Sequence, residues 1–149
     1  MDNVLNNDPN LISNWLTLTH IQMTVANELE ANLLENYQLS LKEFYLLLSL
    51  SEAPDKKLKL QQLESMVGLS QSAVSRLVSR FEAKGCGALQ RISCNDDRRS
   101  IYTSLTPYGQ DKVDRALVTF EEVLSAAFPE QQVEQLLQQM LRLKQTDSK

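Results

Sequence analysis

Apolar residues recur at helical spacing along most of the chain, and this pattern predicts a mainly α-helical protein. Over residues 10–35 they stand at positions 11, 15, 18, 25, 29 and 33, which indicates a first helix with one apolar stripe. Ser40 and Glu43 form the S-x-x-E pattern of a helix-capping box, so a second helix begins there and runs to about Ser51. Its sequence, LSLKEFYLLLSL, is apolar on nearly every side, so we expect this helix at the centre of the core.

The segment from residue 58 to 85 predicts two short helices joined by a tight turn. The first covers about 60–66, and its inward side chains are expected to be Leu63, Met66 and Val67. Gly68 supplies the backbone freedom of the turn, and Ser70 is placed to cap the next helix. That helix covers 71–84, and its apolar side chains follow the i, i+3, i+4, i+7 spacing at Val74, Leu77, Val78 and Phe81. Two helices joined by a glycine-containing turn form a helix-turn-helix.

A β-hairpin and two further helices are predicted after the helix-turn-helix. Residues 88–93 and 100–105 are expected as short strands, joined by the charged turn CNDDRR. Thr-Pro at 106–107 is typical of a helix start, and the helix that follows carries an apolar stripe of Val113, Leu117, Phe120, Leu124 and Phe128. Pro129 interrupts it, and a last helix is expected over about 130–144. The predicted fold class is therefore mostly α with a small β-hairpin wing.

Length and composition favour a soluble protein. The chain has 149 residues, of which 42% are hydrophobic and 23% charged, enough to bury a core. Its first residues, MDNVLNNDPN, carry acidic rather than basic side chains, unlike a secretory signal peptide, and the apolar run Phe44 to Leu50 is too short to span a bilayer. Two cysteines, Cys86 and Cys94, do not make a disulfide framework. We therefore expect a cytoplasmic protein.

Charge is distributed unevenly along the chain. Nine basic and four acidic residues lie between Lys56 and Tyr102, a net charge of +5, whereas the remaining residues carry a net charge of −9. A positive segment between acidic flanks is expected where one region contacts a polyanion and the rest stays clear of it. The alternative for any single cluster is a solvated charged surface.

Three segments of the chain resemble the MarR family of winged helix-turn-helix transcriptional regulators. In order, they are LSLKEFYLLLSL, LQQLESMVGLSQSAVSRLVSRFEAKG and DRRSIYTSLTPYG. The likeness extends from about Leu11 to Leu143. Its most specific part is a fixed order of motifs: the helix-turn-helix, a Lys-Gly, an Asp-x-Arg at Asp97-Arg98-Arg99, and a Leu-Thr-x-x-Gly at 105–109. Between the Lys-Gly and the Asp-x-Arg, the segment KGCGALQRISCNDDRR is slightly longer than is common in the family.

The resemblance implies a division of labour along the chain. Residues 37–106 would form the winged helix-turn-helix DNA-binding region, and 1–36 with 107–149 a helical dimerisation region. The terminal helices carry apolar stripes that one small winged domain does not cover alone, and the resemblance implies that a second copy covers them. The expected dimer-interface residues are Leu11, Trp15, Leu18, Leu124, Phe128, Val133, Leu136 and Met140. For any one of these side chains, packing within one chain is the alternative.

The outer face of the second helix of the helix-turn-helix has the side chains expected of a major-groove reader. Short polar residues near its start let the backbone approach DNA closely, and these are Ser70, Gln71, Ser72 and Ser75. Gln71 can pair with adenine, while Arg76 and Arg80 are placed for guanine edges or phosphates. The alternative is an ordinary solvent-exposed helix face. A helix of so acidic a protein would, however, be expected to carry Glu there.

The arginines of the wing suggest contact with the minor groove, where negative potential is concentrated. Asp97 would hold an arginine side chain extended, and the resemblance implies that Arg99 enters the groove while Arg98 contacts a phosphate. The alternative is a solvated turn with weak surface ion pairs. Because a twofold dimer presents two recognition helices about one DNA turn apart, a pseudo-palindromic operator is expected.

Other candidate sites are weaker. Relatives often bind small phenolic or lipophilic ligands in a crevice, which the resemblance would place among Trp15, His20, Tyr37, Phe44 and Tyr45, although each of these could equally belong to the core. His20 is the only histidine, and no Cys, His and Asp cluster has metal-ligand spacing, so neither a metal nor a cofactor is expected. Cys86 and Cys94 are read as small buried thiols, with a redox sensor as the alternative.

The sequence therefore predicts a homodimeric, sequence-specific regulator of transcription that binds double-stranded DNA, acts as a repressor and is released by a small ligand. No phosphate-binding loop, nucleophile elbow or paired carboxylates suggest an enzyme. The competing interpretations are a winged-helix protein-interaction module that does not bind DNA and a cysteine-based redox-sensing regulator.

Overall fold

The structure is a computed structural model that describes residues 10–83, 87–94, 97–128, 138, 141 and 142. Its elements follow in the order α1 (Leu11–Tyr37), α2 (Leu41–Glu52), the 3-10 helix η2 (Pro54–Lys56), β1 (Lys57–Lys59), α3 (Leu60–Val67), α4 (Gln71–Ala83), β2 (Leu89–Cys94), β3 (Asp97–Leu105) and α5 (Pro107–Ala127). The predicted fold class, mostly helical with a small antiparallel sheet, is confirmed. Most of the predicted last helix over 130–144, together with Gly85, lies outside the described residues. Among the described helices, none is long and apolar enough to cross a membrane.

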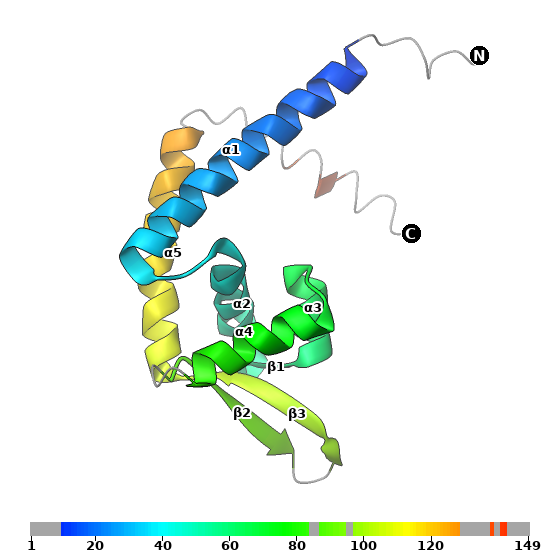
Figure 1. Ribbon diagram of the computed structural model, residues 1–149, viewed down its shortest axis with the longest axis vertical. Helices are drawn as coiled ribbons and strands as arrows, with labels where there is room; N and C mark the ends of the chain where they lie inside the picture. Colours follow the sequence, from blue (N-terminus) through cyan, green and yellow to red (C-terminus); the bar gives the residue numbers. More distant parts are fainter. Residues whose placement is uncertain (1–9, 84–86, 95–96, 129–137, 139–140, 143–149) are drawn as a thin grey trace, which may run out of the picture.

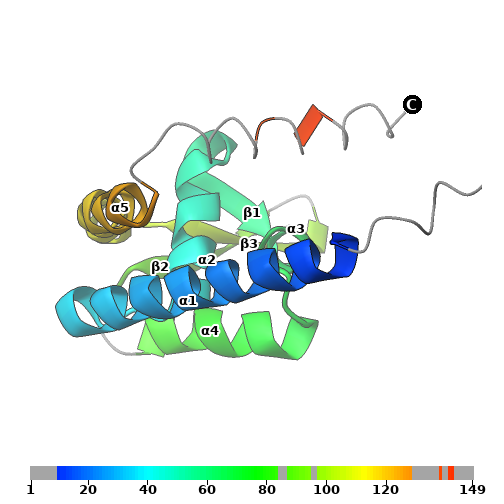
Figure 2. The same ribbon diagram turned by 90° about the horizontal axis from the view of Figure 1, so that it is seen from above.

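Helix α1 and the β-hairpin lie toward opposite ends of the described chain, and α5 runs along one side from the root of the hairpin to α1 (Figure 1). The C-terminal half of α1 packs against α5, and its N-terminal half extends beyond the rest of the described chain. Seen from above, α1 passes over the helix-turn-helix part and α5 stands to one side of it, viewed nearly end-on (Figure 2). This arrangement keeps α4 and the hairpin at the end that faces away from α1.

Helix α2 is the centre of the core, as predicted. Phe44, Leu46, Leu47 and Leu50 are all fully buried, which explains why its sequence is apolar on nearly every side. The predicted capping box is also confirmed. The Ser40 hydroxyl accepts a hydrogen bond from the Glu43 backbone N–H at 3.1 Å, and the Glu43 carboxylate accepts one from the Ser40 N–H at 2.8 Å.

Helices α3 and α4 form the predicted helix-turn-helix. Gly68 ends α3 in the left-handed conformation, with φ +76°, which a residue with a side chain adopts at a cost. Leu63 and Val67 are buried, but the expectation that Met66 also faces inward is wrong, because its side chain is 55% exposed. The buried stripe of α3 runs through Leu60, Leu63 and Val67, and Met66 lies about 100° around the helix from Val67, outside that stripe.

The sheet has three strands in the order β1-β3-β2, all antiparallel. The hairpin of β2 and β3 was predicted, but β1 was not. Leu58, the middle residue of β1, is buried between two lysines and pairs with Thr103 of β3. Three residues of alternating character are too short a pattern to identify a strand without the partner strand beside them.

The hairpin is joined to α5 by the Leu-Thr-x-x-Gly segment. The Thr106 hydroxyl accepts a hydrogen bond from the Gly109 N–H at 3.1 Å, which confirms Thr106 as the N-cap of α5. The Thr106 N–H in turn donates to the Ala88 carbonyl oxygen at 3.1 Å, just before β2 begins. A Cβ at Gly109 would lie 2.7 Å from Leu105 Cδ1 and closer still to the Ala88 oxygen. A glycine is therefore required where the start of the wing meets the start of α5.

Candidate nucleic-acid interface

Helix α4 divides cleanly into a buried and an exposed side. Val74 and Val78 are fully buried and Phe81 is nearly so, as the i, i+4, i+7 spacing predicts. The Ser70 hydroxyl accepts a hydrogen bond from the Ala73 N–H at 3.3 Å, so its predicted capping role is confirmed. The opposite side of the helix is the surface that a DNA groove could meet.

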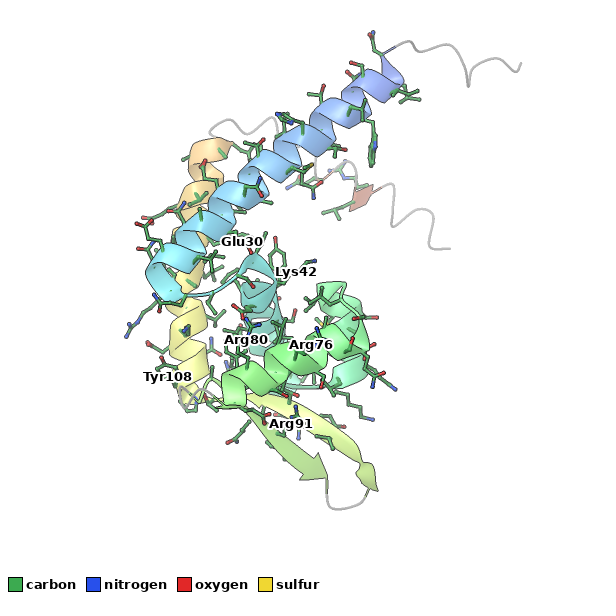
Figure 3. All side chains as sticks on the ribbon, viewed as in Figure 1. Glu30, Lys42, Arg76, Arg80, Arg91 and Tyr108 are labelled. Atoms are coloured by element: carbon green, nitrogen blue, oxygen red, sulfur yellow. The ribbon has the colours of Figure 1, made fainter. Side chains whose placement is uncertain are left out.

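The exposed side of α4 carries the short polar residues and both arginines predicted for DNA contact. Gln71, Ser72 and Arg76 are exposed, and Ser75 is half-buried. Arg76 makes no ion pair with any residue that the structure describes, and Figure 3 shows it on the helix. Its guanidinium is therefore available to a phosphate or a base edge.

Arg80 lies nearer the edge of α4, beside α2. Its Nη1 atom is 2.6 Å from Oε2 of Glu43, whose side chain is only 5% exposed, whereas the Arg80 side chain is 51% exposed. The sequence predicted Arg80 as a DNA contact but gave no sign of this partner, which is 37 residues away. Glu43 was identified only as a helix cap.

The other edge of α4 is tied to the wing by an arginine that the sequence analysis did not select. Arg91 of β2 places its Nε atom 2.9 Å from Oε1 of Glu82 and donates from Nη2 to the Ser79 hydroxyl at 3.0 Å. Arg91 lies opposite Thr103 of β3, on the face of the sheet that packs against the helices (Figure 3). The first strand of the wing is thereby held against the C-terminal half of α4.

The wing itself is a β-hairpin that projects from the body (Figure 1). Its pairing is regular from Leu89 to Ser93 and shifts between Ser93 and Cys94. The backbone of Asp97, Arg98 and Arg99 lies at the start of β3, while their side chains lie outside what the structure describes. Their predicted roles remain predictions.

Only part of the positive charge of the winged-helix region lies beside α4. Lys57 and Lys59 of β1 sit over the Tyr102 ring, with Nζ atoms 5.1 Å and 5.7 Å from its centroid. These side chains alternate with buried Leu58, so they occupy the sheet face turned away from the helices. The basic segment therefore has two surfaces, and α4 with the wing is one of them.

The residues predicted to line a ligand crevice divide between the core and the outer half of α1. Phe44 is fully buried and stacks on Phe120 with ring centroids 4.9 Å apart, and Tyr45 meets the same ring edge-on. Burial raises the pKa of the Tyr45 hydroxyl above its usual range. The Tyr37 hydroxyl donates to the Arg115 carbonyl at 3.0 Å and lies 2.6 Å from the Thr119 hydroxyl oxygen. These three aromatic residues therefore pack α1, α2 and α5 together.

Trp15 and His20 lie on the outer half of α1. Trp15 is about 33 Å along the helix from Tyr37, because each residue of an α-helix rises about 1.5 Å. A shallow, open hollow on the surface is lined by Ile12, Ser13, Leu16, Thr17 and His20. His20 thus faces a surface hollow on α1, separate from the Phe44 cluster.

The predicted dimer-interface residues divide in three ways. Leu11 and Trp15 are 60% and 61% exposed, and Leu18 is half-buried. Leu124 and Phe128, at the end of α5, are also half-buried. The last three, Val133, Leu136 and Met140, lie outside the described residues.

The cysteines and metal ligands offer no second site in the part of the chain that the structure covers. No group of three His, Cys, Asp or Glu side chains is close enough there to hold a metal ion. Cys86 is outside the described residues, and Cys94 is described only as the last backbone position of β2.

Comparison with known proteins agrees with this geometry. Residues 39–101, which run from just before α2 into β3, match the sequence pattern of the MarR family. No curated protein sequence matches the chain.

Several solved structures share the fold. The regulator Sco3205 of Streptomyces coelicolor, solved in complex with DNA, superposes with a TM-score of 0.80 at 20% identity, over 93% of this chain and 90% of that one. The regulator BldR of Sulfolobus solfataricus gives 0.77 at 24% identity, over 91% and 94%. BpsR of Bordetella bronchiseptica, whose DNA binding is regulated by 6-hydroxynicotinic acid, gives 0.71 at 19% identity, over 88% and 91%. These likenesses establish a common winged-helix architecture along almost the whole chain.

Proposed function

Because residues 39–101 match the MarR family, we propose that this chain belongs to that family and is a transcriptional regulator that binds double-stranded DNA. The observation that carries the proposal is the exposed side of α4. Gln71, Ser72 and Arg76 stand there without an acidic neighbour on the same face, and the helix has a geometry that fits the major groove. Short side chains at the start of α4 allow the backbone close to the base edges.

The wing supplies a second set of contacts in this proposal. Arg99 enters the minor groove beside the recognition helix, Arg98 contacts a phosphate, and Asp97 holds the arginine side chain extended before DNA arrives. The strand that carries these residues pairs with β2, which Arg91 fastens to α4. Recognition helix and wing therefore approach the duplex as one unit.

We propose that the regulator acts as a homodimer. The outer half of α1 exposes apolar side chains that one copy of the described chain leaves uncovered, including Ile12 at 71% and Leu16 at 60%. A second copy related by a twofold axis would cover them and present two α4 helices about 34 Å apart, one turn of B-DNA. The expected operator is therefore pseudo-palindromic.

Repression and release by a small aromatic or lipophilic ligand complete the proposal. BpsR offers a precedent, since its DNA binding responds to a small aromatic acid. A ligand that entered among Tyr37, Phe44 and Tyr45 would have to displace the Phe120 ring. The hollow beside Leu16 and His20 is lined in part by side chains that the proposed dimer covers, so a ligand there would lie at the interface between the two copies.

Family and fold are those of transcriptional regulators rather than enzymes. We accordingly propose that the protein catalyses no reaction, requires no cofactor and acts in the cytoplasm. The competing function is a winged-helix module that binds only proteins. The salt dependence of DNA affinity distinguishes it from the proposed DNA-binding function. A DNA-binding domain releases counterions, so its affinity falls steeply with salt.

The test is selection of bound duplexes from a random pool, followed by titration of the enriched sequence at several salt concentrations. We expect a pseudo-palindromic consensus and a slope of log affinity against log salt that corresponds to several phosphates. Retention of no duplex at low salt would refute DNA binding and favour the protein-interaction module. Loss of binding after mild oxidation, restored by a thiol reductant, would favour the redox-sensing alternative.

A further inference from the structure

Glu43 uses both oxygens of its buried carboxylate for different purposes. Oε1 accepts the hydrogen bond from the Ser40 N–H at 2.8 Å, which completes the cap of α2. Oε2 accepts a hydrogen bond from Nη1 of Arg80 on α4 at 2.6 Å. A cap requires only the first of these contacts, and Gln would serve there as well as Glu. The negative charge at this position is therefore matched to Arg80.

The anchor that holds Arg80 is itself fixed on both sides. The Leu41 N–H, one residue into α2, donates to Oε2 of Glu30 on α1 at 2.8 Å. Lys42 Nζ donates to the Val67 carbonyl at the end of α3 at 3.0 Å. Figure 3 shows Glu30 and Lys42 at this end of α2, with Arg80 on α4 nearby. The first turn of α2 thus has no freedom to follow Arg80, so Arg80 is the partner that becomes ordered.

Arg80 has capacity beyond this ion pair. A guanidinium carries five N–H donors in a planar fork, and a single bond from Nη1 leaves the others free to bind a second acceptor. Half of the Arg80 side chain is exposed, and it stands one helical turn after Arg76 on the same side of α4. Its unused donors therefore face the surface that a groove would meet.

We propose that Glu43 is a positioning residue for DNA binding, which holds Arg80 so that its outward N–H donors meet a backbone phosphate at the edge of the major groove. An arginine loses side-chain freedom when it binds, and a buried carboxylate that orders it beforehand removes that loss from the binding step. The inference rests on the proposed DNA-binding function and adds to it a phosphate contact and the residue that prepares it.

Glu43→Gln is the decisive variant, because the amide keeps the helix cap while it removes the charged partner of Arg80. Ordinary electrostatics predicts that loss of a negative charge near DNA tightens binding. Our proposal predicts the opposite, a loss of about threefold to tenfold in affinity for the selected duplex. The control is Glu64→Gln, which removes the same charge from α3 at a side chain without an ion pair among the described residues. It should leave affinity unchanged or slightly raised.

Arg80→Gln and the double variant complete the cycle. Arg80→Gln should weaken binding by about tenfold and lower the salt slope by about 0.9, the value for one phosphate contact. The double variant should bind no more weakly than Arg80→Gln alone, since Glu43 acts only through Arg80. If Glu43→Gln does not fold, Arg80→Lys serves instead. It keeps the charge, but a compact ammonium does not bridge carboxylate and phosphate as a fork does, so affinity should still fall.

The results separate this inference from the proposed function. Wild-type protein that binds no duplex refutes the function itself. If the wild type binds and Glu43→Gln binds as tightly as Glu64→Gln, Glu43 does not position Arg80. An unchanged salt slope for Arg80→Gln, an additive double variant, or full affinity of Arg80→Lys would each overturn the inference.

Discussion

Arg91 Nε lies 2.9 Å from Oε1 of Glu82, and this pair joins the first strand of the wing to the recognition helix. On the other edge of the same helix, Arg80 reaches Glu43 of α2. Helix α4 is therefore held from both flanks, while Arg76 between them is left to the solvent. Arg91 fixes the wing to the helix, Glu43 orders Arg80, and Arg76 makes no ion pair with any described residue, which is a more specific arrangement than a uniformly basic surface.

Arg91→Met should weaken DNA binding several-fold with little effect on folding. Both partners are partly exposed, so the pair contributes at most about 1 kcal/mol to the free energy of unfolding. The wing, however, would lose its fixed angle to α4. Duplex titration and urea denaturation measure the two effects separately. Arg115→Met, which breaks the exposed Arg115–Asp111 pair on α5, is the matched control and should leave both quantities nearly unchanged. Equal DNA affinities for the two variants would show that Arg91 does not orient the wing.

Gly109→Ala should destabilise the protein by about 1–3 kcal/mol, the usual cost of overpacking a closely packed site. The added methyl would press on the Leu105 side chain and the Ala88 carbonyl, where the wing begins. Chemical denaturation of the variant measures the loss. Tyr108→Ala changes the neighbouring, exposed residue and should cost far less. A Gly109→Ala variant as stable as the wild type would mean that the wing root tolerates a wider separation.

Local signals in the sequence predicted most of the fold. The capping box at Ser40 and the N-caps at Ser70 and Thr106 were identified correctly, because a cap involves residues three apart and its chemistry is visible in the sequence. The buried spacing of α4 was equally clear, because thirteen residues repeat the helical period several times. Met66 was misplaced, since α3 has only eight residues and its stripe is correspondingly ill-defined.

Contacts between distant segments could not be predicted in the same way. Strand β1 is recognisable only beside β3, and the partners of Arg80 and Arg91 lie on other elements. The crevice residues illustrate the same limit. A sequence shows that Phe44 and Tyr45 are aromatic and near the second helix, but not that Phe120 of α5 fills the space between them. Their packing follows from the crossing of α2 and α5, which the local pattern does not contain.

Arg99→Ala should reduce affinity for the selected duplex at least several-fold at moderate salt. The expected cause is loss of a guanidinium from the minor groove, so the effect should be larger on flanks of A·T pairs, whose narrow groove concentrates negative potential. Competition titrations with A·T-rich and G·C-rich flanks measure both quantities. Lys112→Ala removes one positive charge from α5 and serves as the control. Unchanged affinity for Arg99→Ala would remove the wing tip from the mechanism.

Leu16→Glu should convert the dimer into monomers and abolish tight operator binding. Leu16 lies on the exposed apolar side of α1 with Ile12 and Trp15, so twofold symmetry would bring two added carboxylates into one apolar interface. A charge buried there without a partner destabilises the dimer by several kcal/mol in practice, and a twofold dimer would bury two such charges. Sedimentation velocity at micromolar concentration measures the assembly. Thr17→Glu adds the same charge on the side of α1 that carries Ser13, Thr17 and Thr24, and should remain dimeric. A dimeric Leu16→Glu variant would place the interface elsewhere, and a monomeric one that still bound its operator tightly would separate DNA binding from dimerisation.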